Sequence, residues 1–255
     1  MQFSANLGFL WNELSLPDAI RAAKQAGFAA VECHWPYDTP AAEVKQVLTE
    51  TGLTMLSLNT HPGNPANSEF GLAALPGREQ ETRQSIDQAI EYAAAINTPN
   101  IHVMAGFTTG QQAHNTFISN LNYATGKAAA HGITILVEAL NHYDAPGYFL
   151  QTSAQAAAII EEVAADNLKL MFDCYHLQIM EGDISRRLTS LLPLIGHIQI
   201  ASVPDRAEPD HGELDYRHIF RLLRELGYRA PLGAEYKPAT TTEQGLGWLK
   251  TTGGD

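Results

Sequence analysis

Short apolar runs alternate with longer amphipathic stretches along the whole chain. The short runs lie near residues 2–8, 28–34, 54–60, 100–106, 134–140, 168–175, 196–201 and 231–236, and their length and composition predict strands. After each run, apolar residues recur with helical spacing, over 17–26, 40–51, 79–96, 113–131, 153–165, 183–192, 215–226 and 241–250. Strand followed by helix, repeated along 255 residues, predicts an α/β fold: one (β/α)₈ TIM barrel domain spanning residues 1–255.

Residues with known preferences for helix boundaries agree with this division. Pro17 suits a first helical turn, Gly27 suits a helix end, and Ser153 suits an N-cap. No proline-rich or serine-rich linker divides the chain. The longest irregular segment, residues 61–79, exceeds an ordinary strand-to-helix connection. It is either a binding loop over the active face or a surface excursion.

Four of the predicted strands carry an oxygen-bearing side chain near the point where the apolar run ends. These side chains are Glu138 in "ILVEAL", Asp173 in "LMFDCYH", Gln199 in "IGHIQIA" and Glu235 in "PLGAEY". Each alone could be a polar group hydrogen-bonded at a strand end. The carboxyl ends of barrel strands converge on one face, however, so we expect the four to form one cluster.

Three carboxylates in a partly desolvated pocket repel one another unless they are protonated or a cation lies among them. Three carboxylates and one amide make an all-oxygen ligand set. Such a set favours Mg²⁺ or Mn²⁺ over zinc. The sequence therefore predicts a divalent metal site formed by Glu138, Asp173, Gln199 and Glu235.

Several histidines lie near the same strand ends. His176 follows Asp173 by three residues and His61 follows the third strand, so both are candidates for contact with a substrate. His102 and His197 lie within strands, where a histidine is more often a hydrogen-bonded core group.

Two basic residues follow strands at the predicted active face. Arg206 lies on the loop that follows the seventh strand, and Lys237 directly follows Glu235. The forked donors of an arginine can hold a substrate carboxylate or hydroxyl, and Lys237 is a second candidate for that task.

The composition of the chain limits the kinds of partner that it can bind. The formal net charge of −12 argues against a nucleic acid or an anionic membrane, because both require a basic face. No apolar window approaches the ~18 residues of a membrane span, and the amino terminus has no signal-peptide pattern. The two cysteines, Cys33 and Cys174, have no CxxC spacing and are expected to be buried free thiols. We expect a cytoplasmic protein with a small anionic substrate; the sequence is also compatible with a homo-oligomer.

The motifs together resemble a known family. The runs "FSANLGFL", "WPYD", "LPGRE", "ILVEALNHYDAPGYFL", "FDCYHLQIMEGD", "HIQIASVPDRAEPDHGELDY" and "GAEYKPATTTEQGLGW" are similar to those of the hydroxypyruvate isomerases, which are xylose-isomerase-like TIM barrels. The family includes the 2-oxo-tetronate isomerases, which "NTHPGN" and "HVMAG" resemble more closely. The segments "NHYDAPGYF" and "YHLQIMEGD" are closer to hydroxypyruvate isomerase.

The resemblance implies roles for particular residues. It places the family's metal ligands on Glu138, Asp173, Gln199 and Glu235, its proton-shuttling glutamates on Glu138 and Glu235, and substrate contacts on His176 and Arg206. The implied reaction is metal-dependent interconversion of hydroxypyruvate and tartronate semialdehyde, with isomerisation of a 2-oxo-tetronate or another small sugar acid as the alternative.

Two other classes share parts of this pattern. The same superfamily includes abasic-site endonucleases, whose metal sites are rich in histidine and bind zinc. In this chain Gln199 lies where a histidine would be a better ligand for zinc. A non-catalytic sugar-acid binding protein would need the pocket, but not two acids that exchange protons.

Overall fold

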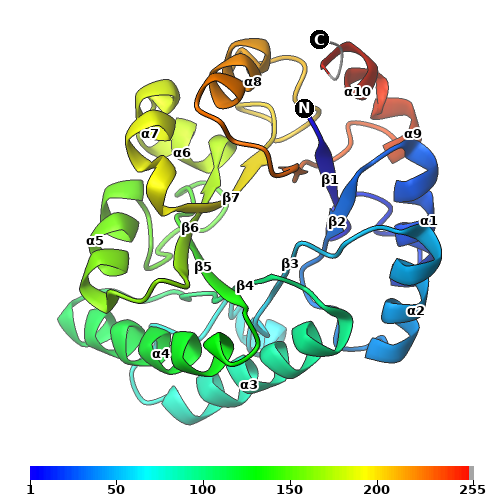
Figure 1. Ribbon diagram of the computed structural model, residues 1–255. Coiled ribbons are helices and arrows are strands. Elements are labelled where there is room, and N and C mark those ends of the chain that lie inside the picture. The colour runs from blue at the N-terminus through cyan, green and yellow to red at the C-terminus, as the bar shows by residue number, and fades with distance from the viewer. Residues whose placement is uncertain (253–255) are drawn as a thin grey trace.

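A ring of parallel strands forms the centre of the computed structural model, which describes residues 1–252 (Figure 1). The strands are β1 (Phe3–Asn6), β2 (Ala30–Glu32), β3 (Ser57–Asn59), β4 (Asn100–His102), β5 (Thr134–Glu138), β6 (Leu168–Asp173), β7 (Ile195–Ile200) and β8 (Leu232–Ala234). Their order in the eight-stranded sheet is β2-β1-β8-β7-β6-β5-β4-β3. A parallel bridge between Val31 and Met55 joins the two ends of this sheet. The predicted (β/α)₈ barrel is therefore confirmed.

Helices surround the strands (Figure 1). They are α1 (Leu16–Ala26), α2 (Ala41–Thr51), α3 (Glu79–Ile96), α4 (Gln111–Ala129), α5 (Ser153–Val163), α6 (Cys174–Met180), α7 (Ile184–Leu191), α8 (Tyr216–Glu225), α9 (Thr242–Gly245) and α10 (Gly247–Thr252), with the 3₁₀ turns η1 (Pro65–Asn67) and η2 (Leu192–Leu194). Local chemistry sets several boundaries. The Ser15 hydroxyl caps α1 by accepting from the Asp18 N–H, and Gly27 ends that helix in the left-handed conformation, with φ of 94°.

Two predicted boundaries were wrong. Helix α6 is absent from the sequence prediction, in which the strand 168–175 extends over its first two residues. The Asp173 carboxylate stops the strand by accepting the Tyr175 N–H at 2.8 Å, and thereby caps α6. The last predicted helix, 241–250, is divided into α9 and α10.

Apolar side chains fill the layer between strands and helices, whereas the carboxyl end of the barrel interior is polar. Asn6, Glu138, Asp173, Gln199 and Glu235 are all at most 6% exposed. These residues lie at or near the carboxyl ends of different strands, which converge at one end of the barrel. The polar residues at the strand ends consequently face one another instead of solvent.

Helix α10 returns the end of the chain to the amino-terminal strand. The Trp248 ring packs edge-on against Phe3 with centroids 4.9 Å apart, and its indole N–H donates to the Tyr236 hydroxyl at 3.1 Å. We expect Trp248→Ala to lower the free energy of unfolding by about 3–5 kcal/mol, the usual cost of truncating a buried large aromatic. Denaturant unfolding measures this; Leu14→Ala, at an exposed position, should change stability by less than about 0.5 kcal/mol. Equal losses for both variants would contradict the packing role.

Candidate active site

A cavity of about 350 Å³ opens at the carboxyl end of the barrel. Its polar lining includes Glu138, His176, Arg206, Glu235, His34, His102, Asp144 and Lys237. Phe9, Trp35 and Phe70 add aromatic walls. Phe70 belongs to the long segment 61–79, so part of that segment contributes to the cavity, whereas Ala73 and Ala74 of the same segment are buried in the core.

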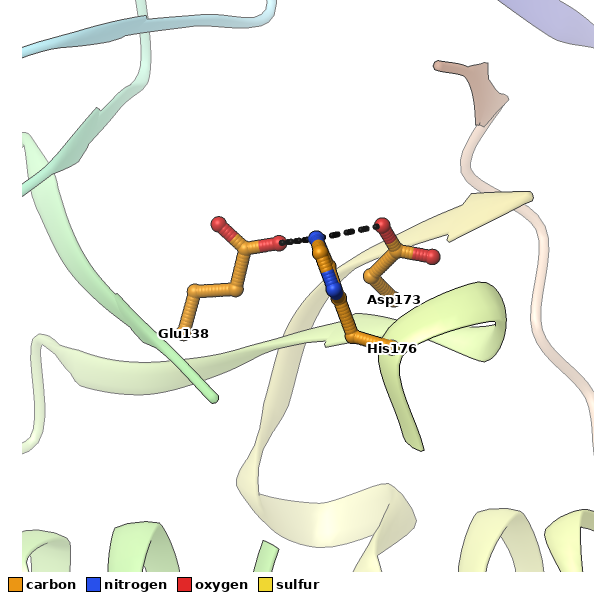
Figure 2. Close-up of side chains that lie close together, drawn as sticks. All are labelled: Glu138, Asp173 and His176. Carbon is orange, nitrogen blue, oxygen red and sulfur yellow. Dashed lines mark ion pairs between the residues drawn. The ribbon is translucent and has the colours of Figure 1, made fainter. Parts of the chain in front are cut away.

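Glu138, Asp173 and His176 lie together at the ends of β5 and β6 (Figure 2). One ligand atom from each lies within 4.8 Å of the other two. The His176 imidazole stands between the two carboxylates, with Nε2 4.0 Å from Glu138 Oε1 and 3.6 Å from Asp173 Oδ2. All three side chains are buried.

Hydrogen bonds from Asn141 determine which nitrogen of His176 carries a proton. The Asn141 main-chain N–H donates to His176 Nδ1 at 3.1 Å. The Asn141 Oδ1 accepts from the main-chain N–H groups of Tyr143 and Asp144, so its amide nitrogen faces the ring, 2.7 Å from Nδ1. Nδ1 is therefore an acceptor, and the proton of the neutral ring is on Nε2.

The environment also keeps His176 neutral. Burial, followed by the nearby Arg206 charge, holds the pKa of His176 well below its ordinary value. Its Nε2–H is then a hydrogen-bond donor directed between the carboxylates. Coordination of a metal through Nε2 would require removing that proton, so His176 is a poorer ligand than the neighbouring oxygens.

Three buried oxygens at this end of the barrel have no hydrogen-bond partner among the described residues. They are Glu138 Oε1, Asp173 Oδ2 and Gln199 Oε1. They come from the adjacent strands β5, β6 and β7, and Asp173 and Gln199 are register partners. A buried polar atom without a partner is destabilising unless a cation or water satisfies it. The set of oxygen donors fits Mg²⁺ or Mn²⁺.

Glu235, the fourth expected ligand, makes different contacts. Its Oε1 accepts from Asn6 Nδ2 at 2.9 Å and lies 3.0 Å from His34 Nε2. Its Oε2 accepts from an Arg206 NH2 group at 3.0 Å, and the same nitrogen is 3.8 Å from Asp173 Oδ2. In the protein alone, the guanidinium of Arg206 thus provides the counter-charge between the two carboxylates.

The two glutamates that line the cavity experience opposite electrostatic environments. Burial, with the charges of Glu235 and Asp173, raises the pKa of Glu138 well above its ordinary value. Burial would also raise the pKa of Glu235, but Arg206 and His34 outweigh it and lower that pKa to about 2. Asp173 is raised to a pKa of about 7 by burial and by the charge of Glu235. The pKa values of the two glutamates are therefore shifted in opposite directions, as in known acid–base pairs.

Arg206 is held rigidly at the cavity wall. Its guanidinium carbon lies 4.9 Å from the ring centre of Phe9 and 5.0 Å from that of Tyr175, and NH1 donates to Asp144 Oδ2 at 3.0 Å. Planar stacking combined with two carboxylate contacts is an arrangement that lysine cannot reproduce.

We expect Arg206→Lys to raise KM by about 10- to 100-fold, because a hydrogen bond to a charged group contributes about 1.5–3 kcal/mol. Steady-state kinetics and thermal unfolding measured together separate this loss from a loss of stability. Arg217→Lys, at an exposed position on α8, is the matched control. A KM equal to that of the wild type would remove Arg206 from the substrate site.

The other predicted residues have varied positions. Lys237 lies at the exposed rim of the cavity. His61 is exposed and borders a separate hollow with Arg78, outside the cavity. His102 is buried, as expected of a core group, but it also lines the cavity, with Nδ1 3.5 Å from Glu138 Oε2. His197 is a hydrogen-bonded core histidine, as predicted, paired with Glu32 at 3.0 Å.

Sequence reasoning missed several residues that support the site. Glu32 ends β2 after the apolar run "FAAV", the same signal that identified the other acids. Asn6, His34 and Asn141 gave no such signal, because each matters through a partner distant in the chain. Cys33 and Cys174 are buried free thiols, as expected.

The fold and the cavity are those of a (β/α)₈ barrel with carboxylates at its strand ends. Comparison with known proteins identifies the family. The chain matches the family model for the xylose isomerase-like TIM barrel over residues 20–252 and belongs to that family. It is 47% identical to a 2-oxo-tetronate isomerase of Cupriavidus necator, over 98% of this chain and 97% of the relative. It is 39% identical to the hydroxypyruvate isomerase of Escherichia coli K12, over 98% of each chain.

A solved structure is also closely similar. A crystal structure described as an AP endonuclease of family 2 from Brucella melitensis matches with a TM-score of 0.95 and 42% identity, over 98% of each chain. The curated relatives confirm that the chain is an isomerase resembling the hydroxypyruvate isomerases. No helix among residues 1–252 is long and apolar enough to cross a membrane.

Proposed function

We propose that the protein is a metal-dependent isomerase of small 2-oxo-3-hydroxy acids, interconverting hydroxypyruvate and tartronate semialdehyde. The observation that carries the proposal is the placement of Glu138 and Glu235 in one cavity, with Arg206 beside them and donating to Glu235. The names of these two relatives, 2-oxo-tetronate isomerase and hydroxypyruvate isomerase, indicate substrates that are small 2-oxo acids. Glu138, Asp173, Gln199 and Glu235 would hold Mg²⁺ or Mn²⁺, which supplies Lewis-acid stabilisation of an enediolate.

The reaction moves a proton between neighbouring carbons. One glutamate removes the proton from C3 of hydroxypyruvate, and the other delivers a proton to C2, while the hydroxyl proton passes from the C3 oxygen to the C2 oxygen. Proton exchange with solvent then returns both carboxyls to their starting states. Strands β5 and β8, which carry Glu138 and lead into Glu235, are separated by β6 and β7 in the sheet. The two carboxyls therefore approach a small ligand from different sides.

The other cavity residues position the ligand and limit its contact with water. The Nε2–H of His176 is available to a substrate oxygen near Glu138. Arg206 retains an Nε–H group without a hydrogen-bond partner among the described residues, and Lys237 adds positive charge at the rim. Both cations suit a substrate carboxylate. The walls formed by Phe9 and Trp35 exclude water from part of the cavity.

Isomerisation of a 2-oxo-tetronate is the second candidate, favoured by the 47% identity to the Cupriavidus necator relative. The chemistry at C2 and C3 is the same; the substrate carries a hydroxymethyl group on C3 in place of a hydrogen. An assay of hydroxypyruvate, 2-oxo-tetronate and common ketoses side by side, with Mg²⁺ and with Mn²⁺, tests both. We expect turnover of one or both acids and little turnover of the ketoses; preference for a ketose would contradict the proposal.

Abasic-site cleavage is a less suitable function despite the description of the Brucella melitensis structure. The net charge of −12 opposes a DNA backbone. The oxygen of Gln199 is also a poor donor for zinc. Incubation with abasic duplex DNA should therefore leave it uncut.

A further inference from the structure

A second buried network lies beside the metal-ligand candidates and connects β1, β2 and β7. Glu32, at the end of β2, is 1% exposed. Its Oε1 accepts from the Ser4 hydroxyl at 3.0 Å, and its Oε2 accepts from Gln199 Nε2 at 2.9 Å and lies 3.0 Å from His197 Nε2. We call these four residues, Ser4, Glu32, His197 and Gln199, the Glu32 network.

The Glu32 network fixes the orientation of the Gln199 amide. Glu32 Oε2 accepts from Gln199 Nε2, so Gln199 presents its NH₂ group to Glu32. Reversing the amide would place two oxygens against each other at this distance. Because the nitrogen donates to Glu32, Gln199 Oε1 is buried without a hydrogen-bond partner among the described residues.

Close packing from β8 keeps this arrangement in place. Gly233 is the register partner of Gln199. A Cβ atom at Gly233 would lie 2.2 Å from Glu32 Oε1 and 2.8 Å from Gln199 Cγ, closer than van der Waals contact allows. The network therefore fills its space completely on this side, and only a glycine leaves room for the Glu32 carboxylate.

The free oxygen of Gln199 lies beside the acids of the site. Gln199 and Asp173 are register partners on β7 and β6, so their side chains leave neighbouring strands at the same level and on the same face. Asp173 Oδ2 is likewise buried and accepts no hydrogen bond from the residues that the structure describes. Glu32, Gln199 and Asp173 all lie beneath the cavity and outside its lining. The hydrogen bond from Gln199 Nε2 connects Glu32 to the metal-ligand candidates.

We propose that Glu32 is a positioning residue: it holds the Gln199 amide so that Oε1 is presented to the divalent cation. This role rests on the proposed metal site. This role gives a reason for the buried carboxylate of Glu32, which lies outside the cavity lining. It also leaves the Gln199 amide with one atom, Oε1, that can bind the cation.

The test is the affinity for Mn²⁺ measured by isothermal titration calorimetry, without substrate, on wild-type protein, Glu32→Gln, Gln199→Ala and the double variant. Loss of a group that orients a metal ligand typically weakens affinity by about 10- to 100-fold, and we expect that loss for Glu32→Gln. In the Gln199→Ala background, Glu32→Gln should cause no further loss. Circular dichroism establishes that each variant is folded.

Glu208→Gln is the matched control, because Glu208 is a buried glutamate outside the cavity, with Oε1 accepting from the Ala239 N–H. Its Mn²⁺ affinity should equal that of the wild type. If Glu32→Gln does not fold, Glu32→Asp keeps the charge beside His197 but withdraws it from Gln199 by one methylene, and the same cycle applies.

Three results would overturn the inference in distinguishable ways. Wild-type Mn²⁺ affinity in the Glu32 variant would show that Gln199 needs no orienting group. An equal loss in both backgrounds would show a through-space effect of charge. Wild-type protein that binds no Mn²⁺ would overturn the proposed metal site, and with it this role for Glu32.

Discussion

Replacing Glu138 or Glu235 by glutamine is expected to lower the isomerisation rate by about 10²–10⁴-fold, the usual cost of removing an acid–base group. Glutamine keeps the size of the side chain and one carbonyl oxygen, but it can neither accept nor release the transferred proton. If the two carboxyls serve opposite steps, each variant should nearly stop net isomerisation. One of them should still exchange the substrate's carbon-bound proton with D₂O, which would identify the base.

Controls separate proton transfer from metal binding and folding. Metal content and thermal unfolding should be measured for both variants, because Glu138 and Glu235 are also proposed ligands. Glu208→Gln, outside the cavity, should retain the kcat of the wild type. Wild-type rates in both metal-loaded cavity variants would refute the two-glutamate mechanism, and His176 would be the next residue to replace.

Removal of divalent ions is expected to abolish turnover. Glu138, Asp173 and Gln199 each direct to this end of the barrel a buried oxygen that has no hydrogen-bond partner among residues 1–252. The nearby charge of Arg206 is already shared among Glu235, Asp144 and Asp173. Dialysis against a chelator should eliminate activity, and added Mg²⁺ or Mn²⁺ should restore it.

Stability provides an independent measurement of the same site. A ligand that binds only the folded state at 100 times its Kd adds about 2.7 kcal/mol to the free energy of unfolding. Saturating Mn²⁺ should therefore raise Tm, and it should raise it less in Asp173→Asn. Full activity in protein shown to be free of metal would contradict the prediction.

The barrel could be predicted from the sequence because its signal is local and repeated. Each strand is a short apolar run and each helix has a regular apolar face. The boundary between β6 and α6 was lost for the same reason: "CYHLQIM" continues the apolar character of the strand, and only the capping contact of Asp173 shows where the helix begins.

The residues of the candidate site could also be predicted only in part. Glu138, Asp173, Gln199 and Glu235 were identifiable because acids and amides are unusual at the end of apolar strands. Their contacts were not: the bond between Asn6 and Glu235 joins residues 229 positions apart, and no local pattern encodes it. His61 followed a strand as His176 did, yet the direction of its loop takes it to the outer surface.

Proton NMR of the wild-type protein with hydroxypyruvate in D₂O follows the proposed proton transfer itself. With Mg²⁺ or Mn²⁺ present, we predict that tartronate semialdehyde forms and that solvent deuterium enters the carbon-bound positions faster than without enzyme. Absence of both product and deuterium incorporation, with hydroxypyruvate and with 2-oxo-tetronate alike, would contradict the account.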